Sequence, residues 1–343
     1  MKVDGLTAEK NTSGILDRLD RNKEEEMPSP AKKETIFSFW EPMEAMPPYL
    51  KLCRQTWERH LAAYEIVFLN YSNLSRYIPA GALDITRLKK FNPAMQKDAL
   101  MIAVLSEHGG IFMDADTIVM KDIRPLIGRL DDAEIVMFNN HLAFMAARPG
   151  SLILMRWLSE IQRKLVKFAG VNPGEKELDW DYLGNSILSD VMDAMIYNTG
   201  FLGKLQKKIL DEPIAAFQSR LSHHQAGAKV IASRLCRSLR QRRREILFHL
   251  MFPKYLKMLD RIKYGFIPEA NYFPARAMPP NEKYDRFWFK NDKQVHDVFL
   301  KNQCIIGLDN SWTPQWYKDL SEKEIFDNGC LLSRTLKVVT KNG

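Results

Sequence analysis

Two kinds of segment are missing from this sequence. No apolar run approaches the ~20 residues that a helix needs to cross a bilayer. The first residues contain no apolar stretch of the kind that defines a secretory leader. Cysteine is also scarce, since the chain has only 4 and none of them forms a CxxC pair. We therefore expect neither a zinc site nor a disulfide framework, and the composition fits a reducing compartment such as the cytoplasm.

Positive charge is concentrated in one segment. The 343 residues carry a net charge of +8, and 45% of them are hydrophobic and 27% charged, which is ordinary for a globular protein. Residues 229–263, however, contain 11 Lys or Arg and 2 Asp or Glu. The rest of the chain is therefore close to neutral. Its length is enough for one large domain or two ordinary domains.

Apolar runs typical of buried strands alternate with helical periodicity in the first half of the chain. The spacing predicts strands at Thr35–Trp40, Tyr64–Asn70 and Ile111–Asp114. Helices are predicted between them, at residues 47–61 and 92–109, and the second of these ends at a glycine. This order of elements predicts an α/β fold with a largely parallel sheet.

The stretch "HGGIFMDADTIV" places two carboxylates, Asp114 and Asp116, where a buried strand ends. Ligands of open α/β sheets bind at the carboxyl ends of the strands. Carboxylate oxygens suit Mg²⁺ or Mn²⁺, which fill their remaining positions with water and phosphate oxygens. The pair could therefore hold a metal that grips a diphosphate. The alternative is that Asp116 caps a turn and Asp114 is solvated.

Residues 96–119 resemble the signature of family 32 of the retaining glycosyltransferases. This family includes capsular polysaccharide synthesis enzymes, and its core is related to that of the clostridial glucosylating toxins. The signature reads Ser-Asp-x-x-Arg-x-x-x-Leu-x-x-x-Gly-Gly-x-Tyr/Trp-x-Asp-x-Asp. The residues that match it in register are Asp98, Leu105, Gly109, Gly110, Asp114 and Asp116.

Weaker similarity extends from about Thr35 to about Trp316, through "IFSFW", "DWDYL", "YNTG", "NYFP" and "DNSWTPQWY". Two departures from the family stand out. Met101 occupies the position of the signature arginine, which normally helps to hold the donor sugar or phosphate. Asp309 and Asn310 stand where many relatives have a histidine.

The resemblance implies a GT-A nucleotide-sugar-binding fold. This fold has a mixed, mostly parallel central sheet flanked by helices, here with an added C-terminal helical region. We expect a flexible N-terminal arm at residues 1–33, the glycosyltransferase domain at residues 34–320 and a C-terminal tail at residues 321–343. The basic segment 229–263 would be an amphipathic helical insertion in the domain.

The resemblance also implies a metal site for Mn²⁺ or Mg²⁺. Asp116 would bind the metal directly, and Asp114 would hold the ribose or bind the metal through water. A C-terminal loop would fold over the diphosphate, so that Asp309, Asn310 or Ser311 completes the metal shell. The alternative for this loop is a turn that carries an interface tryptophan.

Further residues are implied to bind the donor. Asp98 would accept hydrogen bonds from the sugar hydroxyls, although a carboxylate near a helix N-terminus is also explained by the helix dipole. Either of two aromatic residues at the end of the first strand would stack near the base, or pack in the core. The donor-binding set is Phe39, Trp40, Asp98, Asp114, Asn139, Asn140, Ser311 and Trp312.

The basic segment has apolar residues at roughly helical spacing, with arginines over much of the remaining surface. A basic amphipathic helix can lie on an anionic membrane. The alternatives are a solvated face and a groove for an acidic partner. Nucleic-acid binding has no motif beside the charge, and we expect none. The candidate membrane-binding residues are Arg234, Arg237, Arg240, Arg242, Arg243 and Arg244.

Together with the basic segment, the resemblance implies a metal-dependent retaining glycosyltransferase of a bacterial cell, peripherally bound to the inner face of the plasma membrane. It would move a hexose from a nucleotide sugar, a UDP-hexose, to a lipid-linked or growing surface polysaccharide. No catalytic base is assigned, because the departing phosphate could deprotonate the acceptor hydroxyl. A nucleotidyltransferase is a rival, but "FWEPMEAMPP" is not a glycine-rich phosphate loop. A non-catalytic membrane or nucleic-acid adaptor is another.

Overall fold

The computed structural model describes most of the first half of the chain and parts of the second. The expected arm at residues 1–33, apart from Lys33, lies outside the described residues. So do Asn139, Asn140 and the whole basic segment 229–263 with its six candidate arginines. The described residues are 33–138, 141–168, 178–179, 181–188, 190–191, 264–267, 284–290, 292–299 and 303–341.

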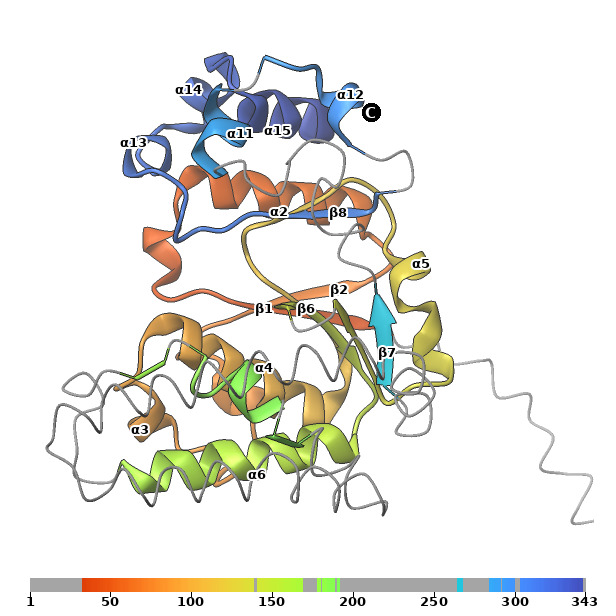
Figure 1. Ribbon diagram of the computed structural model, residues 1–343, viewed down its shortest axis with the longest axis vertical. Helices are drawn as coiled ribbons and strands as arrows, with labels where there is room; N and C mark the ends of the chain where they lie inside the picture. The colour runs from red at the N-terminus through yellow and green to blue at the C-terminus, as the bar shows by residue number, and fades with distance from the viewer. Residues whose placement is uncertain are drawn as a thin grey trace, which may run out of the picture.

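The centre of the fold is a mixed six-stranded sheet (Figure 1). Its strands are β1 (Thr35–Phe39), β2 (Glu65–Leu69), β3 (Gly110–Met113), β5 (Ile135–Phe138), β6 (His141–Ala147) and β7 (Tyr264–Ile267). They lie in the order β2-β1-β3-β6-β5-β7. Only β6 runs antiparallel to its neighbours among these strands. The predicted α/β fold with a mostly parallel sheet is confirmed.

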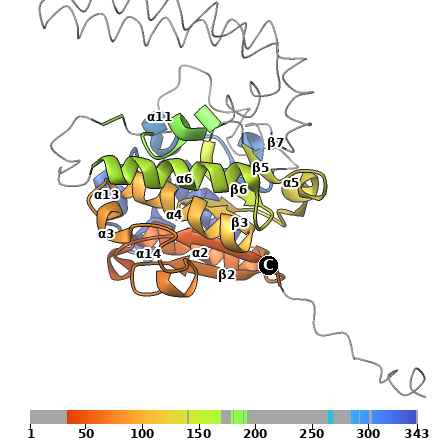
Figure 2. The same cartoon turned by 90° about the horizontal axis from the view of Figure 1, so that it is seen from below.

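Helices cover both faces of this sheet, as Figure 1 shows. One face carries α4 (Pro93–His108) and α6 (Leu152–Lys167), and the other carries α2 (Pro48–His60). Seen from below, α6 and α4 lie in front of the strands (Figure 2). Short helices lie at the edges: α3 (Ile85–Leu88), α5 (Arg124–Ile127) and the 3-10 turns Met43–Ala45, Leu74–Arg76 and Gly128–Asp131.

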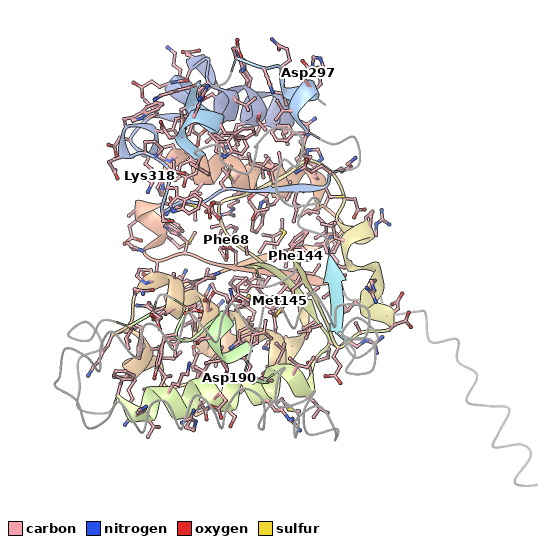
Figure 3. All side chains as sticks on the ribbon, viewed as in Figure 1. Phe68, Phe144, Met145, Asp190, Asp297 and Lys318 are labelled. Carbon is pink, nitrogen blue, oxygen red and sulfur yellow. The ribbon has the colours of Figure 1, made fainter. Side chains whose placement is uncertain are left out.

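Neighbouring side chains on a strand enter different layers. Phe37 on β1 and Met145 on β6 pack with α4 and α6, whereas Ile36 and Phe144 pack on the side of α2. Figure 3 shows Phe144 and Met145 in the interior of the molecule. Side chains alternate between the two faces of a strand, so both faces of the sheet supply a core.

Helix α4 positions the predicted signature. Its N-cap Asn92 accepts a hydrogen bond from the Met95 amide at 2.9 Å, and Gly109 ends it in a left-handed conformation with φ of 63°. Every residue from Asp98 to Leu105 is buried, because α4 lies between the sheet and α6. The helix predicted over residues 92–109 is confirmed.

A second, two-stranded sheet joins distant parts of the chain. Strand β4 (Thr117–Val119) pairs antiparallel with β8 (Ile305–Gly307), and Thr117 lies opposite Gly307. The C-terminal helices pack around α2, as Figure 1 shows. They are α11 (Tyr284–Lys290), α12 (Val295–Val298), α13 (Gln315–Lys318), α14 (Glu322–Asp327) and α15 (Leu331–Lys341).

No helix in the described ranges has the length and the apolar character required to cross a membrane.

We expect Gly110→Ala to destabilise the fold by about 3 kcal/mol, from a left-handed alanine together with overpacking. Gly110 has φ of 91°, and a Cβ there would lie 2.6 Å from the Thr35 carbonyl oxygen of the paired strand. The measurement is urea unfolding. Gly81→Ala is the matched control, because Gly81 has φ of 81° but open space around its Cβ position. Equal losses in the two variants would contradict the packing argument.

Candidate functional site

Asp114 and Asp116 lie in the turn between β3 and β4. The Asp114 amide donates to the Ala143 carbonyl at 2.8 Å, which continues the pairing of β3 with β6. The Asp114 carbonyl accepts from the Thr117 amide at 3.1 Å, so the backbone turns at once. The two carboxylates therefore stand at the carboxyl end of a central strand, at the edge where α/β folds bind ligands.

Asp116 is buried next to the C-terminal loop. Its Oδ2 accepts a hydrogen bond from the Asn310 amide at 2.7 Å, and its carbonyl accepts from the Leu308 amide at 3.0 Å. Among the residues that the structure describes, its carboxylate forms no ion pair. Burial raises the pKa of Asp116 well above its usual range, and the carboxylates of Asp114 and Asp309 add to this effect.

Lys97, which the sequence analysis did not identify, contacts the carboxylates of Asp98 and Asp114. Lys97 Nζ lies 2.9 Å from Asp98 Oδ1 and 3.0 Å from Asp114 Oδ1, and it donates to the Leu142 carbonyl at 3.2 Å. Burial opposes the charged form of Lys97, but the two carboxylates outweigh burial and raise its pKa. Burial raises the pKa of Asp98 despite this lysine. Asp114 is thus paired directly with a cation, whereas Asp116 forms no ion pair in the described structure and feels Lys97 only at longer range.

The Gly184 backbone lies against Oδ2 of Asp98. A Cβ at this position would lie 2.4 Å from Asp98 Oδ2 and 3.0 Å from Leu142 Cδ1, so a larger residue would collide there. Asp98 is 5% exposed, held by Lys97 on one side and covered by the Gly184 backbone on the other. Its proposed contact with sugar hydroxyls stays a prediction.

Tyrosine hydroxyls fix the loop that follows β8. The Tyr49 hydroxyl donates to Asn310 Oδ1. The Tyr284 hydroxyl lies 3.1 Å from Thr313 Oγ1, which itself donates to the Asp309 carbonyl at 3.1 Å. These partners hold the loop in one position beside Asp116. Neither tyrosine was predicted, because their distance along the sequence gives no local signal.

The loop also carries the two other predicted residues. Ser311 is exposed, and Trp312 is 63% exposed with its ring edge against Tyr284 at a centroid distance of 5.8 Å. An indole this exposed is available to a ligand, and its position is held by one aromatic neighbour. Their contacts with the donor stay predictions.

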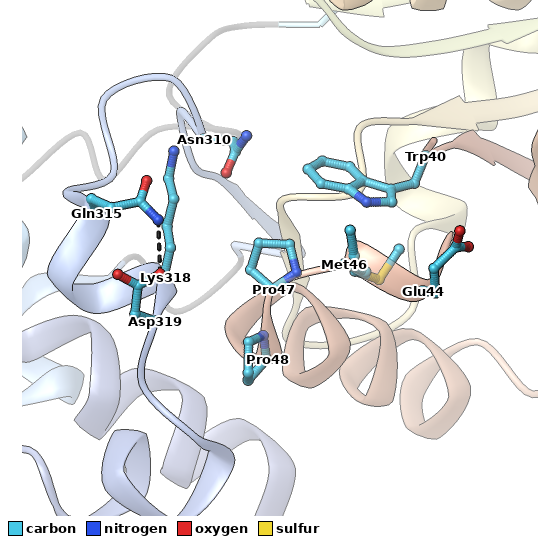
Figure 4. Close-up of a pocket in the computed structure, with 10 residues that line it drawn as sticks. Trp40, Glu44, Met46, Pro47, Pro48, Asn310, Gln315, Lys318 and Asp319 are labelled. Atoms are coloured by element: carbon cyan, nitrogen blue, oxygen red, sulfur yellow. Dashed lines mark hydrogen bonds between the residues drawn. The ribbon is translucent and has the colours of Figure 1, made fainter. Parts of the chain in front are cut away.

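A pocket of about 480 Å³ opens between the end of β1 and the C-terminal loop (Figure 4). Trp40 and Asn310 line it together with Glu44, Ala45, Met46, Pro47, Pro48, Gln315, Lys318 and Asp319. The indole nitrogen of Trp40 is buried and has no hydrogen-bond partner in the described structure. Phe39 instead packs in the core, edge to face with Tyr71 at 5.7 Å. Of the two aromatic candidates, Trp40 lines the pocket.

The structure brings together the residues predicted from the two halves of the chain. Asp114, Asp116, Asp309 and Asn310 meet at one edge, and Trp40 shares a pocket with Asn310. Within the described ranges no group of three or more His, Cys, Asp or Glu forms a ready metal site. A buried carboxylate without a cation and an amide oxygen beside it still match the oxygen donors of Mn²⁺ or Mg²⁺, which take few protein ligands when phosphates supply the rest.

Comparison with known proteins gives a partial match. Residues 7–161 match the family model described as capsular polysaccharide synthesis protein. No curated protein sequence matches the chain. A solved structure titled "PaToxG Glycosyltransferase" is 16% identical, covers 61% of this chain and 86% of its own, and has a TM-score of 0.32. The fold described above rests on the strand order, and the family model matches less than half of the chain.

We expect Lys97→Met to lower the free energy of unfolding by about 3 kcal/mol at neutral pH, because it leaves the buried carboxylate of Asp98 and the half-buried carboxylate of Asp114 without their cation. Urea unfolding measures the loss. Arg163→Met removes an exposed ion pair with Glu160 and should cost less than about 1 kcal/mol. A Lys97→Met variant as stable as Arg163→Met would show that the buried ion pairs contribute little.

Proposed function

We propose that the protein is a metal-dependent retaining glycosyltransferase. It transfers a hexose from a nucleotide sugar, a UDP-hexose, to a lipid-linked or growing surface polysaccharide. The observation that carries this proposal is the carboxylate of Asp116, which is buried and forms no ion pair with the described residues. It lies against Asn310, whose side chain lines the pocket that Trp40 shares. The match to the capsular polysaccharide synthesis family model supports the acceptor class.

The arrangement of charges supports different roles for Asp114 and Asp116. Lys97 already neutralises Asp114, so this carboxylate keeps hydrogen-bonding capacity for a ribose hydroxyl or a water. Asp116 lacks such a partner in the described structure and is the candidate metal ligand, with Asp309 and Asn310 beside it. A bound divalent cation would offset the negative charge that develops on the leaving diphosphate.

The pocket suits the nucleoside end of the donor. Trp40 offers an aromatic face and a buried N–H that has no hydrogen-bond partner among the described residues, and Pro47 and Pro48 supply an apolar wall. An aromatic ring can stack on a base of any kind. The chain therefore orients the nucleotide with Trp40 at one end and Asp116 at the other, where the sugar–phosphate bond would break.

Membrane association belongs to the proposal and rests on the sequence of segment 229–263. Its arginines would hold the enzyme at the inner, anionic face of the plasma membrane, where a lipid-linked acceptor is exposed to the cytoplasm. No nucleic-acid partner is proposed. A donor screen tests the activity: the protein is incubated with Mn²⁺ and each common nucleotide sugar, and release of the nucleotide is measured.

We expect Asp116→Asn to reduce nucleotide release at least 100-fold, the size typical of a lost electrostatic contact in a transition state. The same change should raise the melting temperature at pH 8 without metal. A carboxyl whose pKa is raised on folding costs stability once the pH exceeds its unfolded value, and asparagine removes that charge. Mn²⁺ should raise the melting temperature of the wild type but not that of Asp116→Asn.

The matched control for this variant is Asp297→Asn, which removes an exposed carboxylate at the far end of the molecule (Figure 3). Its activity and its response to Mn²⁺ should equal those of the wild type. If Asp116→Asn keeps its activity and is still stabilised by Mn²⁺, the assignment of the metal to Asp116 is wrong.

We expect Tyr49→Phe to weaken the dependence on Mn²⁺, so that about tenfold more metal is needed for half-maximal rate. The ring stays packed against Tyr317, but Asn310 Oδ1 loses its donor and the loop is held less firmly. The stability cost should be about 1 kcal/mol. Tyr71→Phe, which removes a hydroxyl bonded to Gln96, should match that cost and leave the metal dependence unchanged. Equal metal dependence in both variants would contradict the positioning role.

A further inference from the structure

One wall of the pocket is made by α13, and it carries a lysine. Gln315 and Lys318 are three positions apart, so they share a face of this short helix. Tyr317 is fully buried, and its hydroxyl lies 2.9 Å from Ser333 Oγ, which anchors the helix to the core. Lys318 and Gln315 are thereby left facing the pocket. In Figure 4 the side chain of Lys318 extends toward Asn310, across the pocket from Trp40.

The charge of Lys318 is not used within the described structure. Lys318 is the only cationic side chain among the described residues that line the pocket, and it forms no ion pair with them. The adjacent Asp319 accepts a hydrogen bond from Gln315 Nε2 at 2.7 Å, and Glu44 also lines the pocket. Lys97, at the carboxylate edge, is held by two carboxylates. One ammonium group therefore faces the pocket without an ion-pair partner among the described residues, although two carboxylates share the lining.

The neighbouring edge of the site has the opposite charge. Asp114, Asp116 and Asp309 stand beside Asn310, so an anionic ligand that enters here meets three carboxylates. A diphosphate needs positive charge from the protein in addition to any metal. A lysine ammonium on a flexible stem is a compact charge with three donors that suits phosphate oxygens.

From this geometry we infer that Lys318 binds a phosphate oxygen of a nucleoside diphosphate lodged in the pocket between Trp40 and Asn310. The inference rests on the proposed function and adds a residue to it. The lysine contributes affinity for the phosphates, and it contributes nothing to recognition of the base. Its role is therefore separable from that of Trp40 by the choice of ligand.

Calorimetric titration of the full chain tests this, with Mn²⁺ present and with UDP, UMP and uridine as probes, and GDP and guanosine as a second set. Lys318→Ala should weaken diphosphate binding about tenfold, the loss of one charge-assisted hydrogen bond. Its uridine or guanosine affinity should change less than about twofold. Lys318→Arg should recover most of the affinity, and added salt should weaken wild-type binding more than Lys318→Ala binding.

Lys323→Ala is the control, because Lys323 is an exposed lysine on the neighbouring α14 and does not line the pocket. It should bind every probe as the wild type does. If the wild type binds UDP or GDP and Lys318→Ala binds it with the same affinity, the inference about Lys318 is wrong and the proposed function is unaffected. Equal losses for diphosphate and nucleoside would also overturn the inference, since they indicate a change in pocket shape. A wild type that binds no nucleoside diphosphate would overturn the proposed function as well.

Discussion

The pairing of β4 with β8 is the constraint on which the candidate site depends. Asp116 and Asn310 are 194 positions apart, and the two strands bring them to a 2.7 Å hydrogen bond. Helix α2 fixes β4 from the other side, since the Trp57 indole donates to the Thr117 carbonyl at 2.6 Å and the Val119 amide donates to Thr56 Oγ1 at 2.9 Å. The turn that carries both aspartates is therefore held against two elements, and its geometry is set by the core.

This anchoring lets the fold keep an unfavourable charge. An ionised carboxylate that is buried without a counterion costs stability, and a protein normally avoids it. The three aspartates differ in their partners. Lys97 forms ion pairs with Asp98 and Asp114, whereas the carboxylate of Asp116 accepts one hydrogen bond from a backbone amide and has two acidic neighbours. Carboxylates with strongly raised pKa values concentrate at functional sites. On the proposed function, this imbalance favours Asp116 over Asp114 as the direct ligand of a divalent cation.

The sequence contained the elements of the site but not their contacts. Strand alternation and the glycine stop predicted β1, β2, β3 and α4, and the position of the Asp pair followed from the strand end. The choice between Phe39 and Trp40 was left open, because both lie near the end of β1 and only packing shows which of them faces the pocket. Tyr49 and Lys318 carry no local signal, since Tyr49 bonds to Asn310 only in the folded chain and the pocket that Lys318 lines is also formed only on folding.

Met101, which stands where the family signature has an arginine, lies on the same helix as Lys97. Met101 is fully buried in the apolar core between α4 and its neighbours, so a guanidinium at this position would need partners that the core does not offer. Residues four positions apart lie on one face of a helix, and Lys97 is four positions before Met101. Lys97 contacts Asp98 and Asp114. The carboxylate edge therefore has a positive charge from α4 although Met101 supplies none.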